Sequence, residues 1–342
     1  MKMRLAAAFG SSALVLIAAG ANAAPLASPA DALAAAPSSA VDYAFPKNGT
    51  DVNGLAPANQ AVWVNVGAQR AIMDEIVNGT VHADANRIDA HWPVFAASLA
   101  HERADGSFEY ASNEAFDGQP GADAFWLGYS AQALLLLQSS RLGPQYASRI
   151  AAIRPQLAAT AQWLAQPAQM AYLLHFDGGV TPRNPTVSGA NRLINDAKAL
   201  ILAAKLTGAP GAQEAGEQLL DRALASQSSQ GWFPEHDGPD TSYNAVSAMQ
   251  LAWIALFVND PRLAPAIARS MDWEMGRIDS SGRIDDAGNT RTGNGHLMAN
   301  GKPYPINYSD VTKALVLSSI VTNDPRMMND AVLVSDYARK NF

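Results

Sequence analysis

The side chains best suited to chemistry lie in one short polar stretch, GWFPEHDGPDTSYN, residues 231–244. Glu235, His236 and Tyr243 are residue types that transfer protons in enzymes. Asp240 is a second carboxylate beside Glu235, and paired carboxylates are what glycoside hydrolysis requires. We therefore expect Tyr243, His236, Glu235 and Asp240 to be catalytic residues, and Trp232 and Asn244 to bind substrate.

Structural roles for the same side chains remain open. The flat faces of Trp232 and Phe233 suit stacking on a sugar ring, and they equally suit anchoring the turn on the core. Asp240 or Thr241 is a good cap for the helix expected to follow. Tyr243 and Asn244 then fall in the first turn of that helix, where we expect them to face a cavity.

A second polar set precedes and opens the helix that begins near residue 188. Arg183, Asn191, Arg192 and Asn195 are dense there, although the helix dipole disfavours cations at a helix N-terminus. This placement predicts either an anionic ligand or carboxylate partners such as Glu235 or Asp240. An ordinary structural ion pair is the alternative.

A third set lies in the long segment TRTGNGHLMANGKPYPINYSD, residues 290–310, whose length is typical of a lid or a binding loop. We expect Arg291, His296 and Tyr308 to bind substrate, and Tyr304 and Asn307 are its other chemical groups. An earlier polar turn adds Glu109 and Trp126 to the expected binding residues. Exposure to solvent without a function is the alternative.

Composition excludes several classes of site and partner. The chain has no cysteine, and its six histidines show no paired metal-ligand spacing, so we expect no metal and no cofactor. The formal net charge of −7 argues against nucleic acid as a partner, because phosphate contacts need clustered Lys and Arg. We expect a monomer.

The elements that position these residues are punctuated by two kinds of turn. Short turns such as FVNDPRLAPA and IVTNDPRMMNDA combine a helix-ending Asn with a Pro that opens the next helix. Longer polar turns contain Gly106, Gly178, Gly231 and Gly282, at intervals of about 50 to 70 residues. The two kinds alternate, which indicates a repeated helical hairpin.

Apolar periodicity between these turns predicts an all-α chain. A closed array of five or six hairpins forms an α/α toroid, and it brings the long polar turns together at one mouth, so we expect a single toroid domain over residues 58–342. The expected helices lie near 58–78, 87–103, 121–141, 146–166, 188–206, 211–228, 241–258, 261–277, 308–322 and 326–340.

The N-terminal region predicts export. Residues 1–23 carry Lys2 and Arg4, an apolar run and a small-residue ending, which is the pattern of a cleaved signal peptide. Residues 24–57 are rich in Ala, Pro and Ser, and predict a linker or an arm wrapped on the domain. No other run has the roughly 20 apolar residues of a membrane span, so we expect a periplasmic or secreted protein.

Two quoted segments carry a family resemblance. NRLINDAKALILAAKLTG, residues 191–208, and QSSQGWFPEHDGPDTSYNAVSAMQL, residues 227–251, resemble exported α/α-toroid enzymes of the polysaccharide lyase and glycoside hydrolase kind. The resemblance covers about 188–250 in motif and 88–340 in architecture, and it assigns no single family. Part of the turn also resembles terpene-cyclase toroids, but their acidic protonating motif is absent.

The resemblance and the residue types together imply a polysaccharide or oligosaccharide substrate. Our leading hypothesis is β-elimination in a uronate-containing glycan. Arg192 or Arg291, with Asn191 or Asn244, would neutralise the substrate carboxylate, while Tyr243 and His236 would share the roles of acid and base. The alternatives are hydrolysis by Glu235 with Asp240 or Glu109, and a non-catalytic glycan-binding protein of the envelope.

Overall fold

The computed structural model describes residues 28–47, 66–109, 118–175, 189–236, 238–298 and 300–342. The expected signal peptide lies outside these residues, as do Arg183 and the turn at Gly178. Within the described ranges the chain is all-α, with isolated β-bridges in place of strands.

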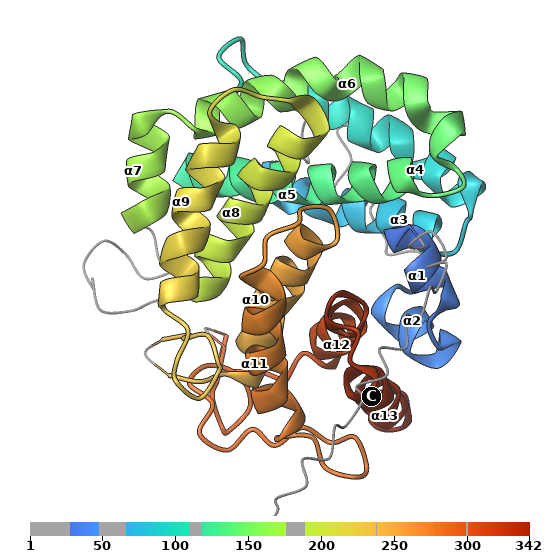
Figure 1. Cartoon of the computed structure of the whole chain (residues 1–342), viewed down its shortest axis with the longest axis vertical. Helices are drawn as coiled ribbons and strands as arrows, with labels where there is room; N and C mark the ends of the chain where they lie inside the picture. Colours follow the sequence, from blue (N-terminus) through green and yellow to red (C-terminus); the bar gives the residue numbers. More distant parts are fainter. Residues whose placement is uncertain (1–27, 48–65, 110–117, 176–188, 237, 299) are drawn as a thin grey trace, which may run out of the picture.

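Nine of the ten predicted helices lie near their expected ranges, and the tenth, expected over 58–78, is α3, which begins only at Arg70 after a 3₁₀ turn; residues 58–65 lie outside the described ranges. The ten helices pair as five hairpins, each with a short turn between its two helices (Figure 1). The pairs are α3 (Arg70–Val81) with α4 (Ala85–Ser98), α5 (Gly118–Ser139) with α6 (Gly143–Leu164), α8 (Ala190–Thr207) with α9 (Ala212–Ala225), α10 (Thr241–Ala255) with α11 (Leu263–Met275), and α12 (Tyr308–Thr322) with α13 (Pro325–Asn341).

Three further helices were not predicted. α1 (Pro29–Ala35) and α2 (Ser38–Ala44) lie in the Ala/Pro/Ser-rich arm, and α7 (Pro167–His175) follows α6. Leu33 and Phe45 of the arm have no exposed surface, so the arm contributes to the core. Two 3₁₀ turns, η2 (Val66–Gln69) and η3 (Leu99–His101), flank α3 and α4.

The hairpins pack in sequence order. α3, α5, α8, α10 and α12 each contact the next in the series, and α4, α6, α9, α11 and α13 cover them from outside. α1 touches α3, α5 and α12, and α2 touches α12 and α13, so the arm lies between the first hairpin and the last (Figure 1). Nearly every residue of α10 is buried, whereas α9 buries a single face, as expected for inner and outer helices.

The three predicted glycine turns that fall within the described ranges share one structure. Each glycine has a positive φ, which glycine adopts without strain. A Cβ atom there would overlap the backbone of the outer helix of the following hairpin, which makes glycine necessary for close approach. The pairs are Gly106 with Ala159 of α6, Gly231 with Arg269 of α11, and Gly282 with Leu333 of α13.

The same three turns are also tied to the following inner helix. In each, the backbone N–H two residues after the glycine donates to a side chain near the start of that helix. The donors and acceptors are Phe108 and Asp123 (3.2 Å), Phe233 and Asn244 (3.0 Å), and Ile284 and the hydroxyl of Tyr308 (3.3 Å). Every described polar turn is therefore seated on the hairpin that comes after it.

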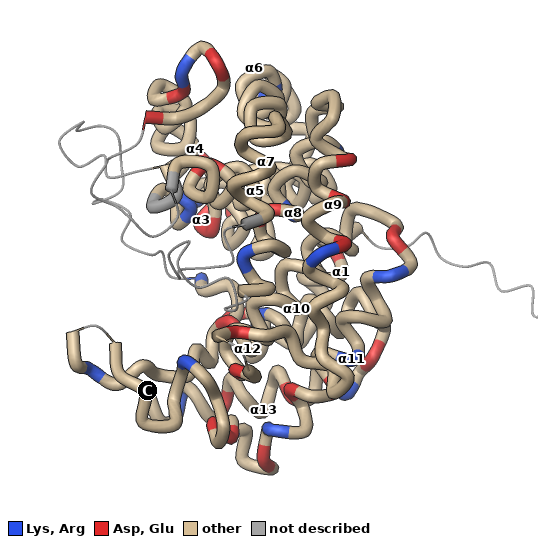
Figure 2. The backbone as a smooth tube through the Cα atoms, turned by 90° about the vertical axis from the view of Figure 1, so that its left-hand side faces the viewer, with Lys and Arg blue, Asp and Glu red and all other residues tan. Residues whose placement is uncertain are grey.

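The two Asn-Asp-Pro-Arg turns form a second repeat, on the outside. Arg262 binds Asp260 within its own turn and Asp221 of α9. Arg326 likewise binds Asp324 and, across 3.0 Å, Asp272 of α11. Figure 2 shows Lys and Arg interspersed with Asp and Glu along the chain. None of the described helices combines the length and apolar character that crossing a membrane requires.

Candidate functional site

The N-terminal ends of three helices, α8, α10 and α12, meet in one polar cluster. Their first residues contact one another through the turn at 231–240 and the segment at 290–307. The connecting pairs are Asn191 with Glu235, Arg291 with Tyr243, and the Asn307 backbone N–H with Ser242, and Arg192 of α8 also lies on the ring of Phe125 of α5. The polar sets predicted to converge therefore do so, with the exceptions given below.

Glu235 is the centre of this cluster. Only 1% of its surface is exposed. Arg291 donates to its Oε1 atom, Asn191 donates to Oε2 across 2.9 Å, and Nε2 of His236 lies 3.4 Å from Oε1. Burial raises the pKa of Glu235 to about 7, although the hydrogen bond and charge of Arg291 act in the opposite direction. A carboxyl with such a pKa exchanges protons readily near neutral pH.

Arg291 connects Glu235 to two tyrosines. Its guanidinium carbon lies 4.3 Å from the ring centre of Tyr243 and 5.8 Å from that of Tyr304. The phenol oxygens of the two tyrosines are 2.8 Å apart. Burial raises the pKa of Tyr243 above its usual value, so its hydroxyl stays protonated and can act as a proton donor.

His236 is held at the edge of the cluster by its backbone. Its φ of 51° lies in the left-handed region, which residues other than glycine seldom adopt. Its side chain is 38% exposed although its neighbour Glu235 is buried. The turn thus places an accessible imidazole directly beside a buried carboxyl, an arrangement that orients a histidine base.

Asp240 has a structural role, as the capping alternative predicted. It is fully buried and accepts the backbone N–H of Tyr243 at the start of α10. It also accepts the backbone N–H groups of Arg291 and Thr292 and the Thr292 hydroxyl, at 2.9, 2.6 and 2.8 Å. Asp240 therefore fixes the backbone of Arg291, and both of its oxygens already accept hydrogen bonds.

Asn244 does not face the cluster as expected. It is fully buried and bonds the Phe233 N–H, Ser270 and Glu274, because it faces the outer helix α11. Phe233 is 1% exposed and anchors the turn, whereas Trp232 is half-buried and donates to Gln230.

Trp126 also has a structural place. It has no exposed surface and packs against Phe95 and Phe108 in the core. Trp126 was expected to bind substrate, and its burial contradicts that. Glu109, also expected to bind substrate, pairs with His101 at 2.8 Å and has an exposed side chain.

His296 and Tyr308 line a neighbouring pocket of about 710 Å³. His296 bonds the carbonyl of Asn289 at 2.8 Å, and Tyr308 is 8% exposed and stacked on Tyr337. Tyr304 also lines this pocket, and its bond to Tyr243 connects the pocket with the Glu235 cluster. The segment 290–307 thus contributes side chains to both the pocket and the Glu235 cluster.

Arg70 and Phe125 lie beside the cluster but were not predicted as site residues. The guanidinium carbons of Arg70 and Arg192 lie 5.1 and 4.2 Å from the ring centre of Phe125. Neither residue is in a polar turn. Phe125 is the neighbour of the buried Trp126 in the sequence, and only the orientation of α5 decides which of the two rings is buried in the core.

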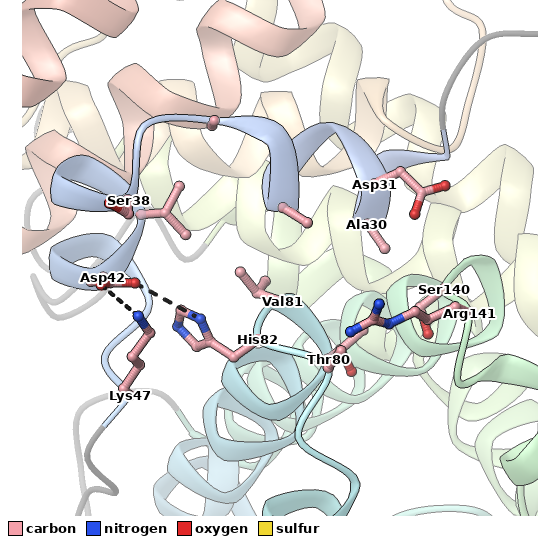
Figure 3. A pocket seen from close by; sticks show the side chains of 14 residues that line it. Ala30, Asp31, Ser38, Asp42, Lys47, Thr80, Val81, His82, Ser140 and Arg141 are labelled. Carbon is pink, nitrogen blue, oxygen red and sulfur yellow. Dashed lines mark hydrogen bonds and ion pairs between the residues drawn. The ribbon is translucent and has the colours of Figure 1, made fainter.

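A second pocket, of about 380 Å³, lies between the arm and the body (Figure 3). His82 and Lys47 both point toward Asp42 there, at 3.8 and 2.8 Å. None of the expected catalytic or binding residues lines it. In the described ranges, no three His, Asp or Glu side chains are grouped so as to hold a metal ion.

Comparisons with known proteins identify no relative: no family model matches the chain, and no curated protein or solved structure is significantly similar to it.

Proposed function

We propose that this chain is an exported α/α-toroid enzyme that cleaves an acidic polysaccharide by β-elimination. The order of packing supports the toroid, because five inner helices follow one another and the arm lies between the last hairpin and the first. The basic start and apolar run of residues 1–23 support export.

The observation that carries the proposed reaction is the hydrogen-bonded pair of phenols beside Arg291. Tyr243 and Tyr304 share a 2.8 Å contact, and Arg291 lies over the ring of Tyr243. The pair can release a proton from one hydroxyl and recover it through the other. A positive charge beside the pair stabilises the phenolate formed when the proton leaves.

The reaction assigns one role to each group. His236, oriented by Glu235, takes the proton from C5 of the uronate. The electrons of that C–H bond form the C4=C5 double bond, and the bond from C4 to the glycosidic oxygen breaks. Tyr243 gives its proton to the departing oxygen, and solvent returns a proton from His236 to the tyrosine pair.

The substrate carboxylate must be neutralised for the C5 proton to become acidic. Arg192 is the group proposed for this role, because its charge lies close enough to Glu235 to lower the pKa of that carboxyl. Its cationic end lies on Phe125, on the side of the cluster toward α5.

Hydrolysis is a second candidate, favoured by the pKa of about 7 for Glu235, which suits a general acid. Its proposed partners lose support, since Asp240 is saturated with hydrogen bonds and Glu109 is paired with His101. A glycan-binding protein that does not cut would use the same cations and aromatic faces.

The test is incubation of the protein with a panel of acidic and neutral polysaccharides, followed by ultraviolet absorption and a reducing-end assay. β-Elimination yields an unsaturated product that absorbs in the ultraviolet, together with new reducing ends. New reducing ends without absorption would establish hydrolysis instead. Binding with neither signal would establish the non-catalytic function.

A further inference from the structure

Two arginines from different helices converge on one aromatic ring beside the Glu235 cluster. Arg70 opens α3, Arg192 is in the first turn of α8, and Phe125 is on α5 between them (Figure 1). The guanidinium carbons are 5.1 and 4.2 Å from the ring centre. They are therefore no farther apart than the sum of these distances.

Arg70 makes no hydrogen bond or ion pair with a carboxylate in the described part of the chain. Its side chain is exposed and lies on the ring of Phe125, and its charge acts on Asp310 at longer range, where it opposes the burial that raises the pKa of that carboxyl. Holding two guanidinium groups at one ring opposes their mutual repulsion. An anion placed between them would relieve that repulsion and take charge-assisted hydrogen bonds from both.

The surroundings suit a sugar as the carrier of that anion. Phe125 and Tyr129 are half-buried and stacked, with ring centres 6.4 Å apart, and Nζ of Lys198 lies 4.2 Å from the ring centre of Tyr129, so a third basic side chain follows the two arginines along α5. Gln69, directly before Arg70, is fully buried, and its amide has no hydrogen-bond partner in the described ranges. Gln69 is the last residue of η2, which packs against α5. Its unpaired amide therefore lies next to Arg70, near the helix that carries Phe125.

We propose that Arg70, Phe125 and Arg192 form a binding subsite for an acidic sugar, in which the two guanidinium groups hold a uronate carboxylate. The subsite adjoins the reacting groups, because Arg192 also lies close enough to Glu235 to lower its pKa. The inference rests on the proposed function for its choice of ligand class. It extends the site to α3 and α5, which the polar turns do not include.

The experiment measures binding without turnover. The full chain is titrated with D-glucuronate and, separately, with D-glucose, which differs by a CH₂OH group in place of the carboxylate, and binding is followed by NMR. Glucuronate should bind more tightly than glucose. Arg70→Gln should weaken glucuronate binding about tenfold, the loss expected for one charge-assisted hydrogen bond, and should leave glucose binding unchanged.

Two further variants make the result specific. Arg222→Gln removes an exposed arginine of α9 and should leave both affinities at the wild-type value. Phe125→Leu should weaken glucuronate binding even if Arg70→Gln disturbs folding, because both guanidinium groups lose the ring on which they lie. Thermal melting of each variant verifies that it is folded.

Equal affinity for the two sugars, or wild-type glucuronate binding in folded Arg70→Gln and Phe125→Leu, would overturn the subsite. Failure of the proposed reaction gives a different result. In that case Arg70-dependent glucuronate binding persists while no acidic polysaccharide is cut.

Discussion

Glu274 provides the sharpest test of how the turn at 231–240 is supported. This glutamate of α11 has no exposed surface, and its Oε2 atom accepts a 2.9 Å hydrogen bond from Asn244, which in turn holds the Phe233 N–H. Its Oε1 atom has no hydrogen-bond partner in the described ranges. Burial raises the pKa of Glu274 to about 8, against the opposing effects of Asn244 and Arg277.

The sign of the pH effect follows from this shift. The unfolded carboxyl has its ordinary pKa of 4.5, so between that value and about 8 the folded state holds one proton more than the unfolded state. Glu274 therefore contributes fully to the free energy of unfolding below pH 4.5, and this contribution is lost as the pH rises toward 8. At 1.36 kcal/mol per pH unit, the loss from this one group is up to about 5 kcal/mol.

Glu274→Gln should abolish the part of the pH dependence that is due to Glu274, because the amide has nearly the shape of the protonated acid and does not titrate. Urea unfolding at a series of pH values from 5 to 8.5 compares the two proteins. Near pH 5 their free energies of unfolding should nearly agree, and near pH 8 the variant should be more stable by several kcal/mol. Glu235, whose pKa is raised to about 7 by burial, adds a loss of the same sign to both proteins, and that loss ends near pH 7.

Glu214→Gln, at an exposed position on α9, is the matched control and should not change the slope. If Glu274→Gln has the same pH dependence as the wild type, the folded protein holds Glu274 ionised. The burial argument would then be wrong.

Three further predictions concern the site and its frame. Tyr243→Phe should lower turnover by roughly 100-fold or more while changing the free energy of unfolding by about 1 kcal/mol or less, and full activity in steady-state assays would contradict the proton-donor role. Asp240→Asn should act through folding, lowering stability by about 2 to 4 kcal/mol in urea titrations, because a buried acceptor of several N–H groups becomes partly a donor. Gly231→Ala should destabilise the protein by more than about 2 kcal/mol, since its Cβ meets the Arg269 backbone. Gly208→Ala, also at positive φ but with open space around its Cβ, should cost about 1 kcal/mol. Equal losses in urea titrations would show that the close approach at Gly231 does not affect stability.

Helix positions were predictable because turn chemistry and apolar periodicity agree. Gly208 and Asn323 end α8 and α12 in the left-handed conformation, and Asp240 caps α10. The helices of the arm were missed because each has only seven residues, which is too short an apolar pattern to distinguish from a linker. Burial against α3 and α12 stabilises them, and that contact is not local in sequence.

The site was predictable only in part, because residue type does not tell which way an inner helix faces. Tyr243 and Asn244 are neighbours, yet one contacts Arg291 and the other contacts Glu274 on the outer helix. Phe125 and Trp126 divide in the same way between the mouth and the core. A rotation of about 100° per residue separates each pair, and only packing fixes its phase.

Since each polar turn is seated on the hairpin that follows it, the site has an order of completion. A chain synthesised from its N-terminus makes the segment 231–240 before α10 and α11, which hold it. Tyr304 then precedes α12 and α13, on which the Gly282 turn rests. The Gly282 turn therefore gains its seat only after the last hairpin has been made as far as Leu333.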